Sequence, residues 1–277
     1  MTVGGHGGDS WNDHENARRY YAFTRQYRPY QETSRDLVAL AMLPSDVAVV
    51  DLACGTGVTT EAILSALGPD GTVTSVDGSA AMLAVAASSI SDSRVTWVHA
   101  RAENLDRHVK VQAGAVICNS AIWQTALDAT MLAVRNVLAV DGRFVFNIGS
   151  EFLDEEEEPG YDNSELLITV TMQGIAARDF DWSPPPPSTS AGPRLSQETV
   201  CRHLAEAGFG LQQVERIEYQ ESPDAVRAWL SVPIFTKRLL PGLPYEHRMS
   251  VLDKTYEQLG PREPGMSRWV VFVAKAQ

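Results

Sequence analysis

The sequence predicts an α/β fold in which a seven-stranded, mostly parallel sheet is flanked by helices, with further helices at the N-terminus and an inserted cap or lid. Short apolar segments without polar alternation recur along the chain, as is typical of strands buried on both faces of a parallel sheet. Segments with helical periodicity lie between most of them. The predicted strands are residues 47–50, 71–76, 95–98, 115–118, 143–148, 210–220 and 269–275.

The first predicted strand leads into a glycine turn. Residues 47–50 are small or β-branched and are followed by Asp51. Gly55 and Gly57 then permit backbone dihedrals that let a ligand approach the chain closely. Residues 59–67 continue with helical spacing, so the segment is interpreted as a strand, a glycine turn and a helix.

The second predicted strand ends on another acid, Asp77, which lies 26 residues after Asp51 (77 − 51). In nucleotide-binding βαβ units an acid at this place accepts hydrogen bonds from ribose hydroxyls, and a spacing of about 20 to 30 residues fits that geometry. Dinucleotide oxidoreductases carry a third glycine three residues after the second, where this chain has Thr60. The pattern therefore favours a nucleoside ligand and disfavours an oxidoreductase.

The residues Asp-Leu-Ala-Cys-Gly-Thr-Gly at 51–57 and Val-Asp-Gly-Ser at 76–79 resemble the first two motifs of class I, Rossmann-like, S-adenosylmethionine-dependent methyltransferases. The resemblance extends over residues 30–148 and implies S-adenosyl-L-methionine (SAM) as the cofactor. It also implies that adenine is bound after the third strand and that a tyrosine of the N-terminal helix closes the cofactor site. The implied cofactor contacts are Asp51, Ala53, Cys54, Gly55, Gly57, Asp77, Gly78, Met82, Ala102, Glu103, Asn119 and Tyr21.

The acceptor side is predicted from topology. Asn119 and Trp123 follow the fourth strand, and in open parallel sheets ligands bind outside the carboxyl ends of the strands. Asn119 can hold the methionine portion of SAM or the acceptor, or it can cap the next helix. Glu151, just past the fifth strand, is the best-placed acid if the acceptor must lose a proton. Glu151 and Asn119 are therefore the catalytic candidates.

Two insertions depart from the minimal fold. Residues 151–194 combine an acidic run, a helical segment and a proline-rich loop, and we predict a lid in which Tyr161 and Trp182 join Trp123 in binding the acceptor. The helices at 223–259 add either to the acceptor pocket or to a homodimer face. The predicted divisions are 1–28, a tail and covering helix; 29–150, the SAM-binding core; 151–194, the lid; and 195–277, which completes the sheet.

Composition limits the class of partner. The net charge of −12 and pI of about 4.9 provide no basic field for nucleic acid or an anionic membrane, so a small-molecule acceptor is expected. No apolar run is long enough for a membrane span. The three cysteines occur singly, without the spacing of a zinc site or a disulfide framework. We expect no metal, and a reducing cytoplasmic setting.

Three functional interpretations fit these motifs. The first is a methyltransferase that acts on a small molecule in biosynthetic or tailoring metabolism. The second uses the same SAM site to transfer or cyclise the aminobutyrate arm, with methylthioadenosine as the product. The third is a catalytically silent SAM-binding partner protein, which the intact cofactor motifs disfavour.

Overall fold

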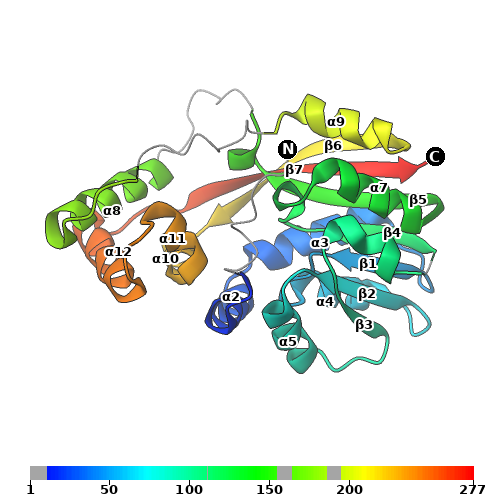
Figure 1. The fold of residues 1–277 in the computed structure, drawn as a ribbon, viewed down its shortest axis with the longest axis horizontal. Helices are drawn as coiled ribbons and strands as arrows, with labels where there is room; N and C mark the ends of the chain where they lie inside the picture. Colours follow the sequence, from blue (N-terminus) through cyan, green and yellow to red (C-terminus); the bar gives the residue numbers. More distant parts are fainter. Residues whose placement is uncertain (1–10, 111, 155–163, 186–194) are drawn as a thin grey trace.

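The computed structural model describes residues 11–110, 112–154, 164–185 and 195–277. A seven-stranded sheet with the order β3-β2-β1-β4-β5-β7-β6 forms its centre (Figure 1). The first five strands are parallel, and β7 pairs antiparallel with both β5 and β6, so the predicted fold class is confirmed. The strands are β1 (Ala48–Leu52), β2 (Thr72–Asp77), β3 (Val95–His99), β4 (Ala113–Cys118), β5 (Leu138–Gly149), β6 (Phe209–Glu221) and β7 (Gly265–Ala276).

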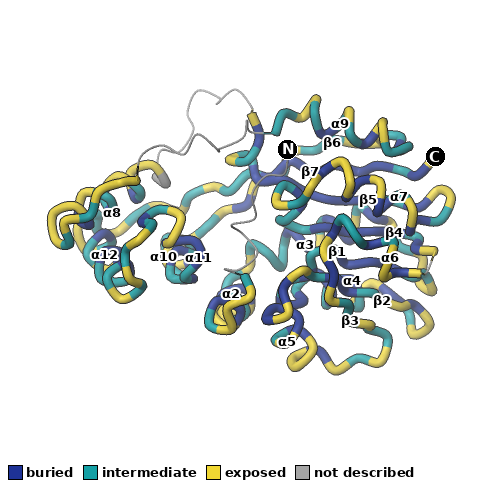
Figure 2. The backbone as a smooth tube through the Cα atoms, in the orientation of Figure 1, coloured by how far each residue is buried: buried dark blue, intermediate teal, exposed yellow. Residues whose placement is uncertain are grey.

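Helices cover both faces of the sheet, because successive residues of each strand point to opposite sides. Val50 packs in the layer that contains α6, α7 and α9, whereas its neighbour Val49 packs against α3 and α4. Figure 2 shows the inner strands β1, β4, β5 and β7 as largely buried, whereas the edge strands β3 and β6 are more exposed. The helices of this core are α3 (Pro29–Ala41), α4 (Val58–Ala66), α5 (Ala80–Ser89), α6 (Leu105–His108), α7 (Leu127–Val137) and α9 (Gln197–Glu206). Short 3₁₀ turns are η1 (Ala102–Asn104), η2 (Ile122–Gln124) and η3 (Ser150–Phe152).

Four further helices form a helical cap beside the sheet: α8 (Ser164–Phe180), α10 (Pro223–Ser231), α11 (Pro233–Leu239) and α12 (Tyr245–Leu259). They lie at one end of β6 and β7, where these strands continue past β5 (Figure 1). Ile168 and Met172 of α8 pack against Val251 and Leu252 of α12 in a hydrophobic cluster separate from the sheet. Because α8 supplies half of that cluster, it is a structural part of the cap.

The N-terminal helix α2 (His14–Gln26) connects the core to the helical cap. Phe23 packs among Val232, Ile234 and Phe235, and the Ile234 N–H donates to Asn16 Oδ1 at 3.0 Å. None of the described helices is long and apolar enough to cross a membrane. The arrangement places α2 between the sheet and the cap, next to the carboxyl ends of β1 and β4.

Candidate active site

The glycine loop after β1 is held by the acid that ends β2. The Gly55 N–H donates to Asp77 Oδ2 at 2.8 Å, and the Ser79 N–H donates to Asp77 Oδ1 at 2.7 Å. Ala53 and Gly55 both have positive φ, 56° and 54°. A Cβ built on Gly55 would meet only Tyr20 Cε1, at 3.8 Å, so the loop leaves room for a ligand above it.

Asp51 lies beneath this loop and is only 1% exposed. Its Oδ2 accepts a hydrogen bond from Thr60 Oγ1 at 2.6 Å, whereas its Oδ1 has no hydrogen-bond partner among the described residues. Burial raises the pKa of Asp51 to about 7, and the Thr60 hydrogen bond opposes that rise. A buried carboxylate with an unpartnered oxygen is costly, and a cationic ligand nearby would stabilise its charged form.

The other predicted contacts of the glycine loop face different surroundings. A Cβ on Gly57 would lie 2.5 Å from Ile90 Cδ1, so this glycine allows close packing against the end of α5. Cys54 is buried, and burial raises the pKa of its thiol well above the usual value. The Gly78 carbonyl lies 3.1 Å from His99 Nε2, and Gly78 is exposed.

The predicted adenine side lies around η1 and the start of α5. Glu103 Oε1 accepts from the Ala126 N–H at 2.8 Å, so Glu103 also binds the backbone just before α7. Ala102 is buried beside it. Met82 is buried and packs with Trp11 and Tyr20 at the start of the chain's described part. Ala102 and Glu103 stay predicted adenine contacts, and Met82 stays a predicted cofactor contact.

Tyr20, and not Tyr21, lies over the glycine loop. Tyr20 is the nearest side chain above Gly55, and burial raises the pKa of its phenol well above 10, with the Asp77 charge acting in the same direction. The Tyr21 ring instead lies under the Arg25 guanidinium, 4.8 Å from the guanidinium carbon. Tyr21 stays a predicted cofactor contact, but the packing of α2 places its neighbour Tyr20 above Gly55.

Asn119 is held in a polar network at the end of β4. Its Nδ2 donates to Thr33 Oγ1 at 3.0 Å and to Ser34 Oγ at 2.9 Å, and its Oδ1 accepts from Asn147 Nδ2 at 2.9 Å. Asn147 Oδ1 accepts from the Ser120 N–H at 2.6 Å, and Ser120 has φ 62°. A positive φ is unusual for serine and persists where neighbours enforce it. The geometry supports a positioning role for Asn119.

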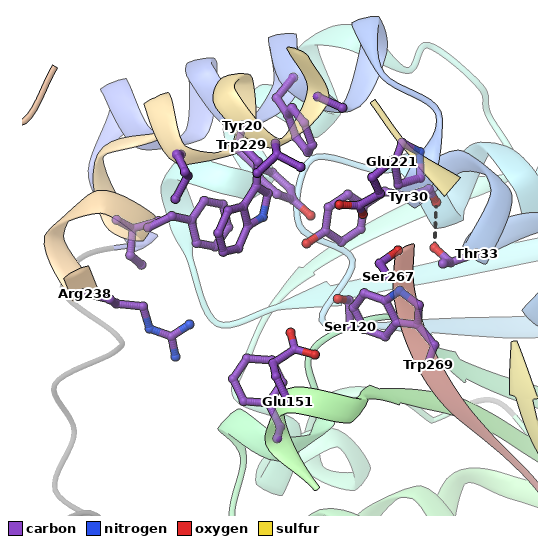
Figure 3. Close-up of a pocket in the computed structure, with 18 of the residues that line it drawn as sticks. Tyr20, Tyr30, Thr33, Ser120, Glu151, Glu221, Trp229, Arg238, Ser267 and Trp269 are labelled. Atoms are coloured by element: carbon purple, nitrogen blue, oxygen red, sulfur yellow. Dashed lines mark hydrogen bonds between the residues drawn. The ribbon is translucent and has the colours of Figure 1, made fainter. Parts of the chain in front are cut away.

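A cavity of about 580 Å³ opens between the carboxyl ends of β4 and β5, the helix α2 and the helical cap (Figure 3). Tyr20 lines this cavity as well as covering Gly55, so the cavity adjoins the glycine loop. Aromatic side chains from both the core and the cap form much of the wall, and they include Tyr20, Tyr30, Trp123, Phe152, Trp229 and Trp269. Such a site suits a largely apolar small molecule.

Tyr30 lies among the polar groups of this cavity (Figure 3). Burial raises its pKa to about 12, the Trp229 and Ser120 side chains interact with its hydroxyl, and the charges of Glu151 and Glu221 act on it. Tyr30 therefore keeps its proton at neutral pH and can donate it in a hydrogen bond. Sequence reasoning missed Tyr30, Ser120 and Glu221, although Ser120 directly follows a residue that it singled out.

Glu151, predicted as a catalytic candidate, lies in the wall of the cavity. Its carboxylate folds back over Gly149 at the end of β5: a Cβ on Gly149 would lie 2.8 Å from Glu151 Cδ and Oε1. Only glycine leaves room for the carboxylate there. The position of the Glu151 carboxylate therefore depends on the glycine at position 149. A sequence pattern does not reveal this dependence.

The three residues predicted to bind the acceptor have different outcomes. Trp123 lines the cavity and stacks on Phe152, with ring centroids 4.4 Å apart. Trp182 does not line the cavity. Its indole N–H donates to the Pro241 carbonyl at 2.9 Å, and its ring packs within the cap. Tyr161 lies outside the described residues.

The helical cap is therefore built differently from the predicted lid. Ile168 and Thr169 of α8 line the cavity, but more of its cap side comes from α10 and α11. The sequence analysis gave two alternatives for the helices at 223–259, a part of the acceptor pocket or a dimer face. Residues of this segment, from α10 and α11, contribute to the wall of the cavity.

Comparison with known proteins supports the methyltransferase class that the sequence motifs indicate. Residues 49–142 match the family described as Methyltransferase domain. Malonyl-[acyl-carrier protein] O-methyltransferase of Priestia megaterium (strain DSM 319 / IMG 1521) is 22% identical over 225 residues, which are 80% of this chain and 77% of that protein. Protein BH2331 of Bacillus halodurans C-125 superposes with a TM-score of 0.53 at 16% identity, over 88% of this chain and 98% of the other. Geranyl diphosphate methyltransferase in complex with SAM superposes with a TM-score of 0.50 at 15% identity, over 89% and 85%.

The sheet order and the glycine loop are those of the class I SAM-dependent methyltransferase fold, and the matches support a SAM-dependent methyltransferase. Residues 49–142, which match the methyltransferase domain family, contain the Gly55 loop, Asp77 and the end of β4.

Proposed function

We propose that this enzyme binds SAM on the Gly55 loop and transfers its methyl group to a small-molecule acceptor in the adjoining cavity, in biosynthetic or tailoring metabolism. The position of Tyr20 carries the proposal, because this side chain covers Gly55 and also lines the cavity of about 580 Å³. A cofactor on the loop and an acceptor in the cavity would therefore meet beside Tyr20. The neighbour named geranyl diphosphate methyltransferase supports a small acceptor, whereas the curated relative is named for malonyl-[acyl-carrier protein].

The residues of the loop fit SAM. Asp77 has lone pairs left for ribose hydroxyls after accepting from Gly55 and Ser79, and the unpartnered Asp51 Oδ1 suits a cationic ligand. When bound, SAM supplies an electrophilic methyl group on a sulfonium, whose sulfur leaves as a neutral thioether. Gly55 leaves the space that such a cofactor needs.

The chain's own side chains align the acceptor. An aromatic cavity excludes water and holds the nucleophile about 3 to 3.5 Å from the methyl carbon, which lowers the barrier by several kcal/mol. Glu151 accepts the proton if the nucleophile must lose one. Tyr30, which stays protonated, donates a hydrogen bond to the acceptor. Asn119 and Asn147 hold Ser120 in the wall.

Gly149→Ala tests whether the position of Glu151 matters. The added methyl group would displace the Glu151 carboxylate, so kcat is expected to fall about tenfold or more, up to the roughly 10²- to 10⁴-fold contribution of a general base. Affinity for S-adenosylhomocysteine should stay within about twofold, because the proposed cofactor site is the Gly55 loop and not the end of β5. In a Glu151→Ala background, Gly149→Ala should change kcat little. An equal loss in both backgrounds would assign the effect to the strand and would argue against a role for Glu151.

Product analysis tests the proposed function. Incubation with SAM and candidate acceptors should yield S-adenosylhomocysteine and an acceptor heavier by one methylene unit, detected by mass spectrometry. Formation of methylthioadenosine would instead indicate attack on the aminobutyrate arm. Tight SAM binding without either product across acceptors that occupy the cavity would favour the silent partner protein.

A further inference from the structure

We infer that the acceptor carries an oxyanion group, a carboxylate or a phosphate, that Arg238 binds where the cavity meets solvent. This inference rests on the proposed function, since it describes the acceptor of that reaction. One side chain of the wall, Arg238, extends its guanidinium into the cavity (Figure 3). Arg238 belongs to the last turn of α11 and is exposed.

The guanidinium of Arg238 rests on an ordered aromatic pair. Its carbon lies 5.7 Å from the centroid of the Phe152 ring, and Phe152 stacks on Trp123 with an interplanar angle of 18°. A guanidinium that lies over an aromatic ring can still donate its N–H groups to an oxyanion. The stack therefore presents a bidentate donor to whatever occupies the cavity.

No ion pair within the described part of the chain uses Arg238 or its neighbour Lys237, which also lines the cavity. Cations at the end of a helix are favourable in themselves, and the helix dipole accounts for the presence of both residues in the last turn. The dipole does not account for a guanidinium that extends into a cavity and stacks on Phe152. That geometry indicates a ligand with negative charge.

Other unpartnered groups in the same wall are also donors. The indole N–H groups of Trp123 and Trp269 and the Ser267 hydroxyl have no hydrogen-bond partner among the described residues. Trp269 is only 9% exposed, and its ring centroid lies 6.2 Å from that of Trp123. An indole nitrogen can only donate, and a buried donor without a partner is destabilising. Ligand oxygens reached by small side-chain movements would relieve these donors.

The negative groups of the cavity lie around the phenol of Tyr30. The charges of Glu151 and Glu221 act on that phenol. An acceptor that places its oxyanion at Arg238 and its nucleophilic atom near Tyr30 would use both the cationic and the anionic groups of the cavity. A purely cationic acceptor would match only the carboxylates.

Binding of simple probes tests the inference. The full-length protein, with and without saturating S-adenosylhomocysteine, is titrated with 3-phenylpropionate, 2-phenylethyl phosphate, the neutral 3-phenylpropanamide and the cationic 2-phenylethylamine. Tryptophan fluorescence reports binding, because Trp123, Trp229 and Trp269 line the cavity. At least one anion should bind tenfold or more tightly than the amide, and the better of the two anions identifies the oxyanion as carboxylate or phosphate.

Matched variants locate the anion. In Arg238→Gln the preference for the anion should fall below threefold, and in Arg238→Lys it should recover in part, because charge without the planar fork is a weaker partner. Arg202→Gln removes an exposed guanidinium of α9 that pairs with Glu206, so it should keep the full preference. Unfolding temperatures within about 2 °C of the parent would show that each variant is folded.

Three results would overturn the inference: anions that bind no better than the amide, an amine that binds most tightly, or a preference that survives Arg238→Gln. Affinity for S-adenosylhomocysteine, measured on the same samples, tests the proposed function separately. A parent protein that fails to bind it would refute the proposed function, while the titrations without it would still decide the role of Arg238.

Discussion

Asp77→Ala is expected to weaken SAM binding by about 3 kcal/mol, roughly a hundredfold, with little loss of folded protein. The carboxylate has two tasks. Its oxygens accept from the Gly55 and Ser79 N–H groups and so hold the glycine loop to the end of β2, and they are the proposed acceptors for the ribose hydroxyls. Alanine removes the ribose contact and also releases the loop, so both losses should appear in the affinity.

Isothermal titration calorimetry with SAM and with S-adenosylhomocysteine measures this effect. Asp70→Ala is the matched control, because it removes the same charge from an exposed turn just before β2. It should bind as tightly as the parent. If Asp77→Ala bound SAM within threefold of the parent, the proposed placement of the ribose at Asp77 would be wrong.

Asp51→Asn is expected to stabilise the ligand-free protein at alkaline pH. The pKa of Asp51 is raised from 3.8 to about 7 by burial, so the folded state holds the proton more tightly than the unfolded state does. The stability linked to that proton is complete below pH 3.8 and is lost as pH rises through 7. Asparagine has no charge to bury, and its oxygen can still accept from Thr60. The gain should be larger at pH 8 than at pH 5 by about 2 to 3 kcal/mol.

Urea unfolding at pH 5 and pH 8 measures the difference between parent and variant. Burial also raises the pKa of Asp77, but this residue is present in both proteins and its contribution largely cancels. Asp46→Asn, in the exposed turn before β1, should show no such pH dependence. SAM should bind Asp51→Asn more weakly if the carboxylate serves a cationic ligand. A gain in stability that is the same at both pH values would show that Asp51 is not buried in its charged form.

Several elements follow from local pattern alone. Helices are present within residues 223–259 as expected, and the last of them is α12. Ser79 caps α5 by accepting from the Met82 N–H at 3.2 Å. Strand ends were less well predicted: β5 begins at Leu138 where 143 was expected, because its first residues pair with β4 through an irregular register. Within the segment 223–259, Pro233 lacks an N–H and starts a separate helix, α11, directly after α10.

By itself the sequence determined the sheet, the glycine loop and the acid at Asp77, because strand and helix periodicity, a turn and a 26-residue spacing (77 − 51) are local properties of a βαβ unit. Which residues form the cavity wall depends on the tertiary structure. The wall joins Tyr20 of α2, Ser120 after β4 and Arg238 of α11, which are far apart in the chain and share no spacing rule. Which of two adjacent tyrosines faces Gly55 depends on how α2 packs between α5 and the helical cap. That packing is a long-range balance of buried apolar contacts, so no local pattern encodes it.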